Sequence, residues 1–207
     1  MLPKPIQNLI DQFTKLPSVG PRQAARFAFY LIKQSKLNLD DFAKAIIDAS
    51  KNLNQCSLCF RIIECQNDKK NKYLCSICKN PQRDKSIICI VEKDTDVEAV
   101  ENTGRYNGLY HVLGESGLKE FSKPNIENLH LKDLIKRIKN SHEIKEIIIA
   151  TSATTEGDTL ALYIAQLLKK NLPANKQITR LGRGLSTGSE LEYMDEETLS
   201  QALLGRK

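Results

Sequence analysis

The chain has 207 residues, of which 41% are hydrophobic and 27% are charged, and its mean hydropathy is −0.38. These proportions are typical of a globular protein of one or two domains, and they exclude collagen-like, coiled-coil and wholly disordered chains. The longest aliphatic runs, Ile87–Val91 and Ile147–Ala150, are far shorter than the ~20 apolar residues that a membrane-spanning helix needs. The first residues, MLPKPIQNLIDQF, do not resemble a signal peptide, so we expect a cytoplasmic protein.

The positive charge is concentrated in the first half of the chain. Residues 1–90 carry 15 Lys and Arg against 7 Asp and Glu, a balance of +8, whereas residues 91–207 carry 16 against 18, a balance of −2. A local basic surface favours a polyanionic partner, because phosphates that are neutralised by cations release their condensed counterions. Solvated surface lysines would give the same charge balance, so the choice between these two interpretations depends on the sequence motifs.

The chain begins with a pattern that is typical of two helices joined by a short hairpin. Apolar side chains recur at the spacing of one helix face over residues 5–16, namely Ile6, Leu9, Ile10, Phe13 and Leu16. Pro17 ends this pattern, and Gly20 is expected to permit an unusual backbone angle. Pro21 suits the first position of a second helix, which continues through RQAARFAFYLI.

This hairpin is a candidate phosphate-binding site. Free backbone N–H groups and the helix dipole favour an anion at the start of the second helix. Arg22 and Arg26 are four residues apart on one face of that helix and are placed to hold adjacent phosphates. Nothing in the segment is expected to read base edges, and a plain helical hairpin with solvated arginines is the alternative.

A third helix is predicted over about residues 40–54. Asp40 or Asp41 is its expected N-cap. Its core stripe is expected to consist of Phe42, Ile46, Ala49 and Leu53. The three helices would form a small helical layer.

Four of the six cysteines follow the pattern C-x2-C-x15-C-x2-C, at Cys56, Cys59, Cys75 and Cys78. Two such pairs present four thiolates in a tetrahedron, which predicts a Zn2+ site, and a complete set of four thiolates indicates a structural role. The segment between the pairs is largely polar, so bound metal would supply its folding energy. Cys65 is a possible substitute ligand, whereas Cys89 lies within the apolar run IICIV and is expected to be buried.

From residue 86 onward, short apolar runs alternate with helical patterns in the order SIICIVE, TDVEAVENTG, GLYHVLG, HLKDLIKRIKN, EIKEIIIA, GDTLALYIAQLLKK and ITRLG. This alternation predicts an α/β fold with a parallel sheet. Ligands of such sheets bind at the carboxyl ends of the strands, where Glu92, Glu156 and Asp158 are expected to approach one another. Acidic groups there can hold Mg2+, but Glu156 and Asp158 are equally suited to capping the next helix.

Other catalytic motifs are missing from the sequence. The glycine-rich segment GRGLSTGS lacks the lysine of a nucleotide-binding loop. The three histidines are scattered, and His111 lies in an apolar strand, where a core role is expected. The acidic segment ELEYMDEETL is expected to form a turn and the start of a solvated helix. The alternative is that it belongs to a subunit or partner surface, with Tyr193 and Met194 as candidate contacts.

The chain resembles the RecR family of bacterial recombination mediators over nearly its whole length, in the four-cysteine segment and in the segments LPSVGPRQAARFAFYLI, IVEKDTDVEAVENTGRYNGLYHVLG, IIIATSATTEGDTLALYIAQLL and TRLGRGLSTGSELEYMDEETLSQALLGR. The resemblance implies a helix-hairpin-helix region, a zinc finger, a Toprim domain and a C-terminal segment, which we place at residues 1–54, 55–80, 81–175 and 176–207.

The same resemblance implies a function in recombinational DNA repair. The protein would be a ring-like oligomer, expected to be a tetramer, that binds single- and double-stranded DNA without sequence specificity. It would act with RecO, and with RecF, to help load recombinase on single-stranded DNA. The implied DNA contacts are Ser18, Val19, Gly20, Arg22 and Arg26. The acidic residues Glu92, Glu156 and Asp158 are candidate partner contacts.

The sequence departs from the family pattern at three places. Ser18 stands where the hairpin usually has Gly, and the linker between the cysteine pairs is longer and contains Cys65. Toprim topoisomerases and primases carry an Asp-x-Asp pair where this chain has Ser152 and Thr154. Neutral hydroxyls do not supply the paired charge that holds Mg2+ beside a phosphate. We therefore expect no enzymatic activity. A Toprim enzyme using Glu92, and a zinc-stabilised interaction module without a DNA role, are the alternatives.

Overall fold

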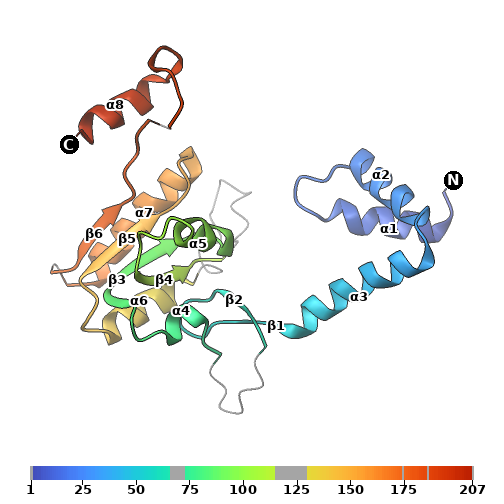
Figure 1. Ribbon diagram of the computed structural model, residues 1–207, viewed down its shortest axis with the longest axis horizontal. Coiled ribbons are helices and arrows are strands. Elements are labelled where there is room, and N and C mark those ends of the chain that lie inside the picture. The colour runs from blue at the N-terminus through green and yellow to red at the C-terminus, as the bar shows by residue number, and fades with distance from the viewer. Residues whose placement is uncertain (1, 66–72, 115–129, 174, 186, 207) are drawn as a thin grey trace. The chain divides into compact units, whose positions relative to one another are not determined.

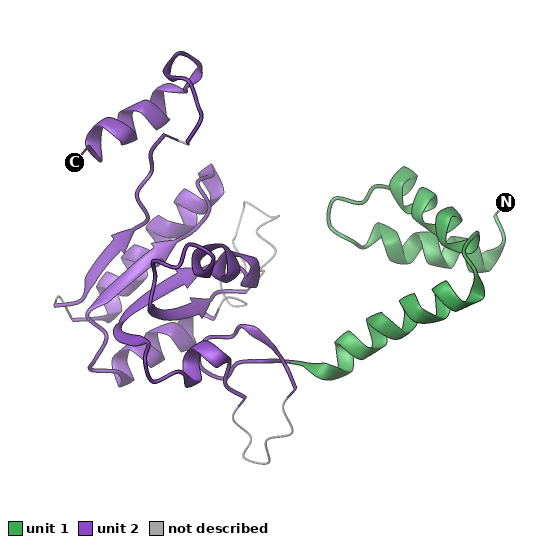
Figure 2. Cartoon of the chain, in the orientation of Figure 1, with its two compact units in different colours: residues 1–53 green, residues 54–207 purple. Residues whose placement is uncertain are grey.

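The computed structural model describes residues 2–65, 73–114, 130–173, 175–185 and 187–206. The chain divides into two compact units, residues 1–53 and residues 54–207 (Figure 2). Part of the expected polar linker between the cysteine pairs, residues 66–72, lies outside the described residues. No helix within the described ranges combines the length and the apolar character needed to cross a bilayer.

Unit 1 contains the three expected helices, α1 (Lys4–Thr14), α2 (Pro21–Ile32) and α3 (Lys36–Asn52) (Figure 1). α1 and α2 pack against each other as an antiparallel pair through a small core of Ile10, Ala24 and Ala28. The Phe13 and Phe27 rings add an edge-to-face contact with centroids 5.7 Å apart. The small alanines let the two helices approach closely, which fixes the hairpin between them.

The third helix differs from its sequence prediction at its start and in its core stripe. It begins at Lys36, because the Ser35 hydroxyl accepts a hydrogen bond from the Asn38 N–H at 3.3 Å. The predicted caps Asp40 and Asp41 therefore lie inside the helix. None of its residues is buried, and the predicted stripe is exposed within the described part of the chain, with Ile46 at 57%.

Unit 2 is built on a four-stranded sheet whose elements follow the predicted alternation: β3 (Asp84–Val91), α5 (Asp94–Glu101), β4 (Gly108–Val112), α6 (Leu131–Asn140), β5 (Glu146–Ala150), α7 (Thr155–Asn171) and β6 (Gln177–Arg180). The strand order is β4-β3-β5-β6 and every pairing is parallel. The prediction of a parallel α/β fold is confirmed. The carboxyl ends of all four strands consequently lie at one edge of the sheet.

Alternate residues of the central strand β3 enter two separate cores. Ile88 and Ile90 pack with residues of α6 and α7, whereas Cys89 and Val91 pack with Val97 of α5 and with the cysteine module, which is the described part of the four-cysteine segment (residues 55–65 and 73–80). This alternation follows from the two-residue period of a strand. Both faces of the sheet are therefore covered, one by α6 and α7 and the other by α5 and the cysteines.

Smaller elements complete the unit. β1 (Leu53–Gln55) and β2 (Ile62–Glu64) form a two-stranded sheet. α4 (Ser76–Lys79) contains Cys78 of the second cysteine pair, and Cys75 is its N-cap. Beyond β6 the chain forms a short 3-10 helix, η2 (Leu191–Tyr193), and α8 (Glu196–Leu204), which Asp195 caps. The predicted turn and solvated helix over ELEYMDEETL are confirmed.

Candidate nucleic-acid interface and metal centre

The hairpin between α1 and α2 turns at Ser18. This residue has a φ of 63°, whereas Gly20 has an ordinary φ of −81° as the N-cap of α2. The expectation that Gly20 supplies the unusual angle is therefore wrong. The Val19 N–H donates to the Leu16 carbonyl at 3.2 Å, and this tight turn requires a left-handed residue just before Val19. A non-glycine residue there costs about 1–2 kcal/mol.

Both arginines predicted to contact phosphate are exposed in α2. Gly20 is the N-cap of the helix and Pro21 is its first residue, and no side chain caps its first turn. The N–H groups of the first turn thus stay available to an anion, beside the Arg22 side chain. Arg26 follows one turn later, so the hairpin holds the predicted phosphate-binding groups in one place.

The four predicted cysteines form a tight group. The ligand atoms of Cys56, Cys59, Cys75 and Cys78 all lie within 4.8 Å of one another. Sulfur atoms bound tetrahedrally at 2.3 Å from a zinc ion are about 3.8 Å apart, so these residues fit that ion. Elsewhere in the described residues, no group of three or more His, Cys, Asp or Glu is placed to hold a metal.

Local hydrogen bonds link the sulfur atoms of this group to one another and to the backbone. The Cys75 N–H donates to the Cys56 sulfur at 3.4 Å, and the Cys78 N–H donates to the Cys75 sulfur at 3.3 Å. Hydrogen bonds from the thiols of Cys59, Cys75 and Cys78 hold the pKa of Cys56 well below its ordinary value. The hydrogen bonds to Cys56 raise the pKa values of Cys59 and Cys78 in turn. Metal ligation requires the deprotonated form, so the ion itself would have to displace the protons of these two thiols.

The two remaining cysteines have different surroundings. Cys65 is exposed and does not belong to the group of four. Cys89 is buried in the core as predicted, and burial raises the pKa of its thiol to about 12. Its thiol therefore stays protonated and packs as a small apolar side chain.

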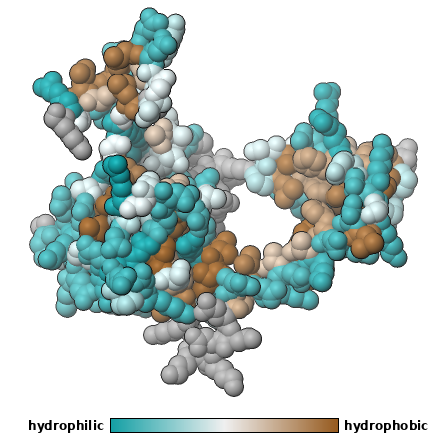
Figure 3. Space-filling model, viewed as in Figure 1, coloured by the Kyte–Doolittle hydropathy of each residue, from teal (hydrophilic) through white to brown (hydrophobic). Residues whose placement is uncertain are grey.

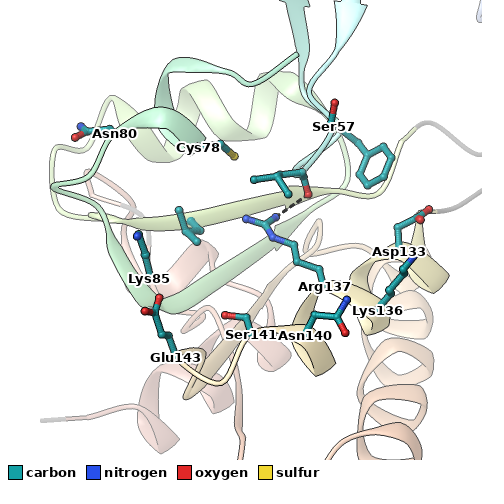
Figure 4. A pocket seen from close by; sticks show the side chains of 13 residues that line it. Ser57, Cys78, Asn80, Lys85, Asp133, Lys136, Arg137, Asn140, Ser141 and Glu143 are labelled. Atoms are coloured by element: carbon teal, nitrogen blue, oxygen red, sulfur yellow. Dashed lines mark hydrogen bonds between the residues drawn. The ribbon is translucent and has the colours of Figure 1, made fainter. Parts of the chain in front are cut away.

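Arg137 of α6 joins the cysteine module to the sheet. Its guanidinium donates to the Leu58 carbonyl at 3.0 Å, as Figure 4 shows, and to the Tyr110 carbonyl at 2.6 Å. The Val112 N–H also donates to the Cys59 carbonyl at 2.8 Å. Beside Arg137 lies an open cavity of about 540 Å³, lined by the cysteine module, β3, β4 and α6. The module is thus fixed to the sheet by hydrogen bonds that main-chain carbonyl groups accept.

An aromatic stack reinforces the same junction. The Phe60 ring stacks on His130, with centroids 3.7 Å apart, and meets His111 edge-on. His111 is buried in β4 as predicted, and burial lowers its pKa to about 3. Its neutral ring donates from Nε2 to the His130 carbonyl at 2.9 Å. Its burial and this hydrogen bond agree with the predicted role of His111 as a core residue.

The three acidic residues at the carboxyl edge do not share one site. Glu92 accepts a hydrogen bond from the Ser152 N–H at 2.6 Å, and Asp158 pairs with Arg180 at 2.8 Å and with Arg183. Glu92, Glu156 and Asp158 do not form a group placed to hold a metal. The alternative, that Glu156 or Asp158 caps α7, is also wrong, because the Thr154 hydroxyl accepts the Gly157 N–H at 3.1 Å.

Two arginine side chains balance the charge of Asp158. The guanidinium groups of Arg183 and Arg180 hold the pKa of this carboxyl below its ordinary value. Arg183 also pairs with Glu197 of α8 at 3.4 Å. Sequence reasoning missed Arg180 and Arg183, although their positions at the end of the last strand and just after it placed them at the carboxyl edge.

Three protein families match the chain in order. They are described as "RecR, helix-hairpin-helix" at residues 6–50, "Toprim domain" at residues 86–181 and "RecR, C-terminal" at residues 184–207. Proteins named "Recombination protein RecR" are similar over 204 residues, or 99% of this chain and 97% of theirs. The identity is 43% for the protein from Leuconostoc mesenteroides and 44% for that from Staphylococcus aureus strain Newman.

Proposed function

We propose that this chain, which belongs to the RecR family of recombination proteins, is a non-enzymatic mediator that binds DNA through the hairpin of unit 1. The observation that carries the proposal is the pair of exposed arginines, Arg22 and Arg26, beside the uncapped first turn of α2. Arginine side chains and free N–H groups bind phosphate oxygens without reading bases. Ser18, Val19 and Gly20 would bring the backbone to the phosphate.

Each hairpin offers few phosphate contacts, so a single copy would bind DNA weakly. We propose that a ring-like tetramer gathers several hairpins around one DNA molecule, single- or double-stranded, because linked weak sites gain affinity through their effective concentration. Apolar side chains exposed on α3 and α8, among them Phe42 and Leu204, support the assembly. Such side chains would gain stability from burial against another copy.

The partners in this proposal follow from the family. RecO, and RecF, would place the oligomer at single-stranded DNA in the cytoplasm, where it helps to load recombinase. Glu92 and Glu156 at the carboxyl edge are the candidate partner contacts. Asp158 belongs to the same edge, but its two arginine partners leave it less negative charge to offer to another protein.

The geometry of the Toprim edge supports a role without catalysis. Ser152 and Thr154 stand where Toprim enzymes carry an acidic pair, and the Thr154 hydroxyl is occupied as the cap of α7. Arg180 and Arg183 neutralise Asp158. A cation-binding site for phosphoryl chemistry needs several free carboxylates around one point, and this edge is arranged differently.

The metal centre is proposed to hold one Zn2+ through Cys56, Cys59, Cys75 and Cys78. Four sulfur ligands complete the coordination of the ion and leave no position for a substrate, so the ion would act as a cross-link. The module that it closes rests on β3 and β4. Its role would be to complete the core of the Toprim domain.

Measuring DNA affinity at several salt concentrations tests the DNA-binding proposal. The variant Arg22→Ala/Arg26→Ala should bind a labelled oligonucleotide at least about tenfold more weakly, since each lost phosphate contact lowers the slope of log affinity against log salt by about 0.7–0.9. Lys169→Ala/Lys170→Ala, which removes two exposed cations of α7, is the matched control. Equal binding by the arginine variant and the parent would show that the DNA contact lies elsewhere.

A further inference from the structure

We propose that α2 carries a stacking site for unpaired bases, formed by Tyr30 between Arg26 and Lys33, which makes single-stranded DNA the preferred ligand. The inference rests on the proposed function, because it assumes that the hairpin holds DNA phosphates. It adds a contact to the bases, which the arginines do not make.

Tyr30 is the most exposed aromatic side chain of unit 1 within the described residues, at 66%. The neighbouring Phe27 packs against Phe13 of α1, whereas no ring contact or side-chain hydrogen bond of Tyr30 is recorded among the described residues. A large ring in water forgoes the stabilisation that burial of its apolar surface would give. The exposed Tyr30 ring is therefore available to stack on a ligand.

Cations flank this ring along one helix face. Arg26 precedes Tyr30 by four residues and Lys33 follows it by three, so all three side chains are neighbours on the surface of α2. They line one open cavity of about 570 Å³ together with Phe27 and Phe29. Figure 3 shows patches of apolar residues on the surface of unit 1 with hydrophilic residues beside them. Rings and cations in alternation are the surface that single-strand-binding proteins present.

The charge around the cavity selects a polyanion over a neutral or basic partner. Between Asp11 and Asp40 the chain contains no acidic residue, and it contains five basic ones: Lys15, Arg22, Arg26, Lys33 and Lys36. Arg22 extends the flanking cations back to the uncapped start of α2. The stripe from Arg22 to Lys33 is about 16 Å long at 1.5 Å per residue, which is enough for a few nucleotides.

A stacking ring distinguishes the two forms of DNA. Bases in a duplex are stacked on one another, whereas an unpaired base has a free face that any aromatic side chain can cover. The arginines hold phosphates of either form. Tyr30 would therefore add affinity for single strands alone, and without sequence preference, because every base has a π-face.

The test compares three labelled probes with the full-length protein by fluorescence anisotropy: oligo-dT, an abasic oligonucleotide of the same length, and a duplex. The parent should bind oligo-dT more tightly than the abasic strand. Tyr30→Ala should weaken oligo-dT binding by about 5- to 100-fold, the loss of one base–ring stack. Its affinity for the abasic strand and the duplex should stay within about twofold of the parent's. Tyr30→Phe should restore oligo-dT binding.

The outcomes separate this inference from the proposed function. If the parent binds none of the probes, the DNA-binding function itself fails. If Arg22→Ala/Arg26→Ala loses binding while Tyr30→Ala keeps the parent's affinity for oligo-dT, only the stacking site is refuted. Native mass measurement provides the last arm. A Tyr30→Ala variant that falls apart into smaller species would assign the ring to an interface between copies of the chain and overturn the inference.

Discussion

At the scale of single residues, Gly157 fixes the backbone of the carboxyl edge. It lies buried in the first turn of α7, and a Cβ atom added there would stand 2.0 Å from the Ser152 carbonyl oxygen and 2.8 Å from its carbon. These are backbone atoms of the loop whose N–H donates to Glu92, so they have little room to move. Gly157→Ala should therefore lower the free energy of unfolding by about 1–3 kcal/mol, measured by urea denaturation.

Gly182 provides the control for this prediction. Nothing lies within 4 Å of a Cβ atom added to it, and its backbone needs no positive φ. Gly182→Ala should change the free energy of unfolding by no more than about 0.5 kcal/mol. A Gly157→Ala variant as stable as Gly182→Ala would mean that the loop relaxes around the added methyl group.

Residue spacing predicted the cysteine group but not the partners of Asp158. The four cysteines lie in two local pairs, and each pair is brought together by one turn of chain. Arg180 and Arg183, by contrast, are 22 and 25 residues away from Asp158 in sequence. The parallel pairing of β5 with β6 brings them close, and this contact exists only once the sheet has formed.

At the scale of elements, the third helix shows where sequence patterns fall short. The acidic pair at Asp40 and Asp41 suggested a cap, yet Ser35 caps the helix one turn earlier. Several residues near the start of α3 have capping side chains, and the choice among them depends on the chain that enters the helix. The predicted core stripe is wrong in two respects: Leu53 lies beyond the helix in β1, and Phe42 and Ile46 are exposed. Periodicity identifies an apolar face but not whether the rest of the chain covers it.

The cysteine module is the element whose stability should depend on metal. Its four ligands also belong to the core that contains Cys89, Val91 and Tyr110. Zinc binding contributes about 10–16 kcal/mol in small zinc-binding peptides, comparable with the whole stability of a domain. Cys56→Ser/Cys59→Ser should therefore lose about one zinc per chain, measured by elemental analysis, and unfold at a lower temperature.

Cys65→Ser serves as the comparison for the metal prediction, since this cysteine lies outside the group of four. It should keep both the metal and the melting temperature of the parent. If the protein melts at the same temperature after a chelator has removed its metal, the structural role of the ion is contradicted. Loss of zinc from Cys65→Ser would instead revise the ligand set.

At the scale of the whole molecule, the sheet of unit 2 has well-buried cores, whereas the other parts of the chain bury few residues. The sheet of unit 2 has two cores. Among the described residues, unit 1 has a core of three buried residues, and neither α3 nor α8 has a buried residue. Small cores contribute little stability. Large apolar side chains nevertheless line both helices, among them Ile46 and Ile47 of α3 and Leu203 and Leu204 of α8. This pattern is typical of elements that complete their packing in an assembly.

The assembly itself gives the last prediction. Phe42→Ser/Ile46→Ser in α3, or Leu203→Ser/Leu204→Ser in α8, should convert a parent tetramer into smaller species in native mass measurement, because each change removes apolar surface from one interface. Leu162→Ser changes one exposed leucine of α7 and should leave the tetramer intact. Since a ring gathers its hairpins only when assembled, the smaller species should also bind DNA more weakly. A monomeric parent that binds DNA as tightly as the proposed ring would remove the need for assembly.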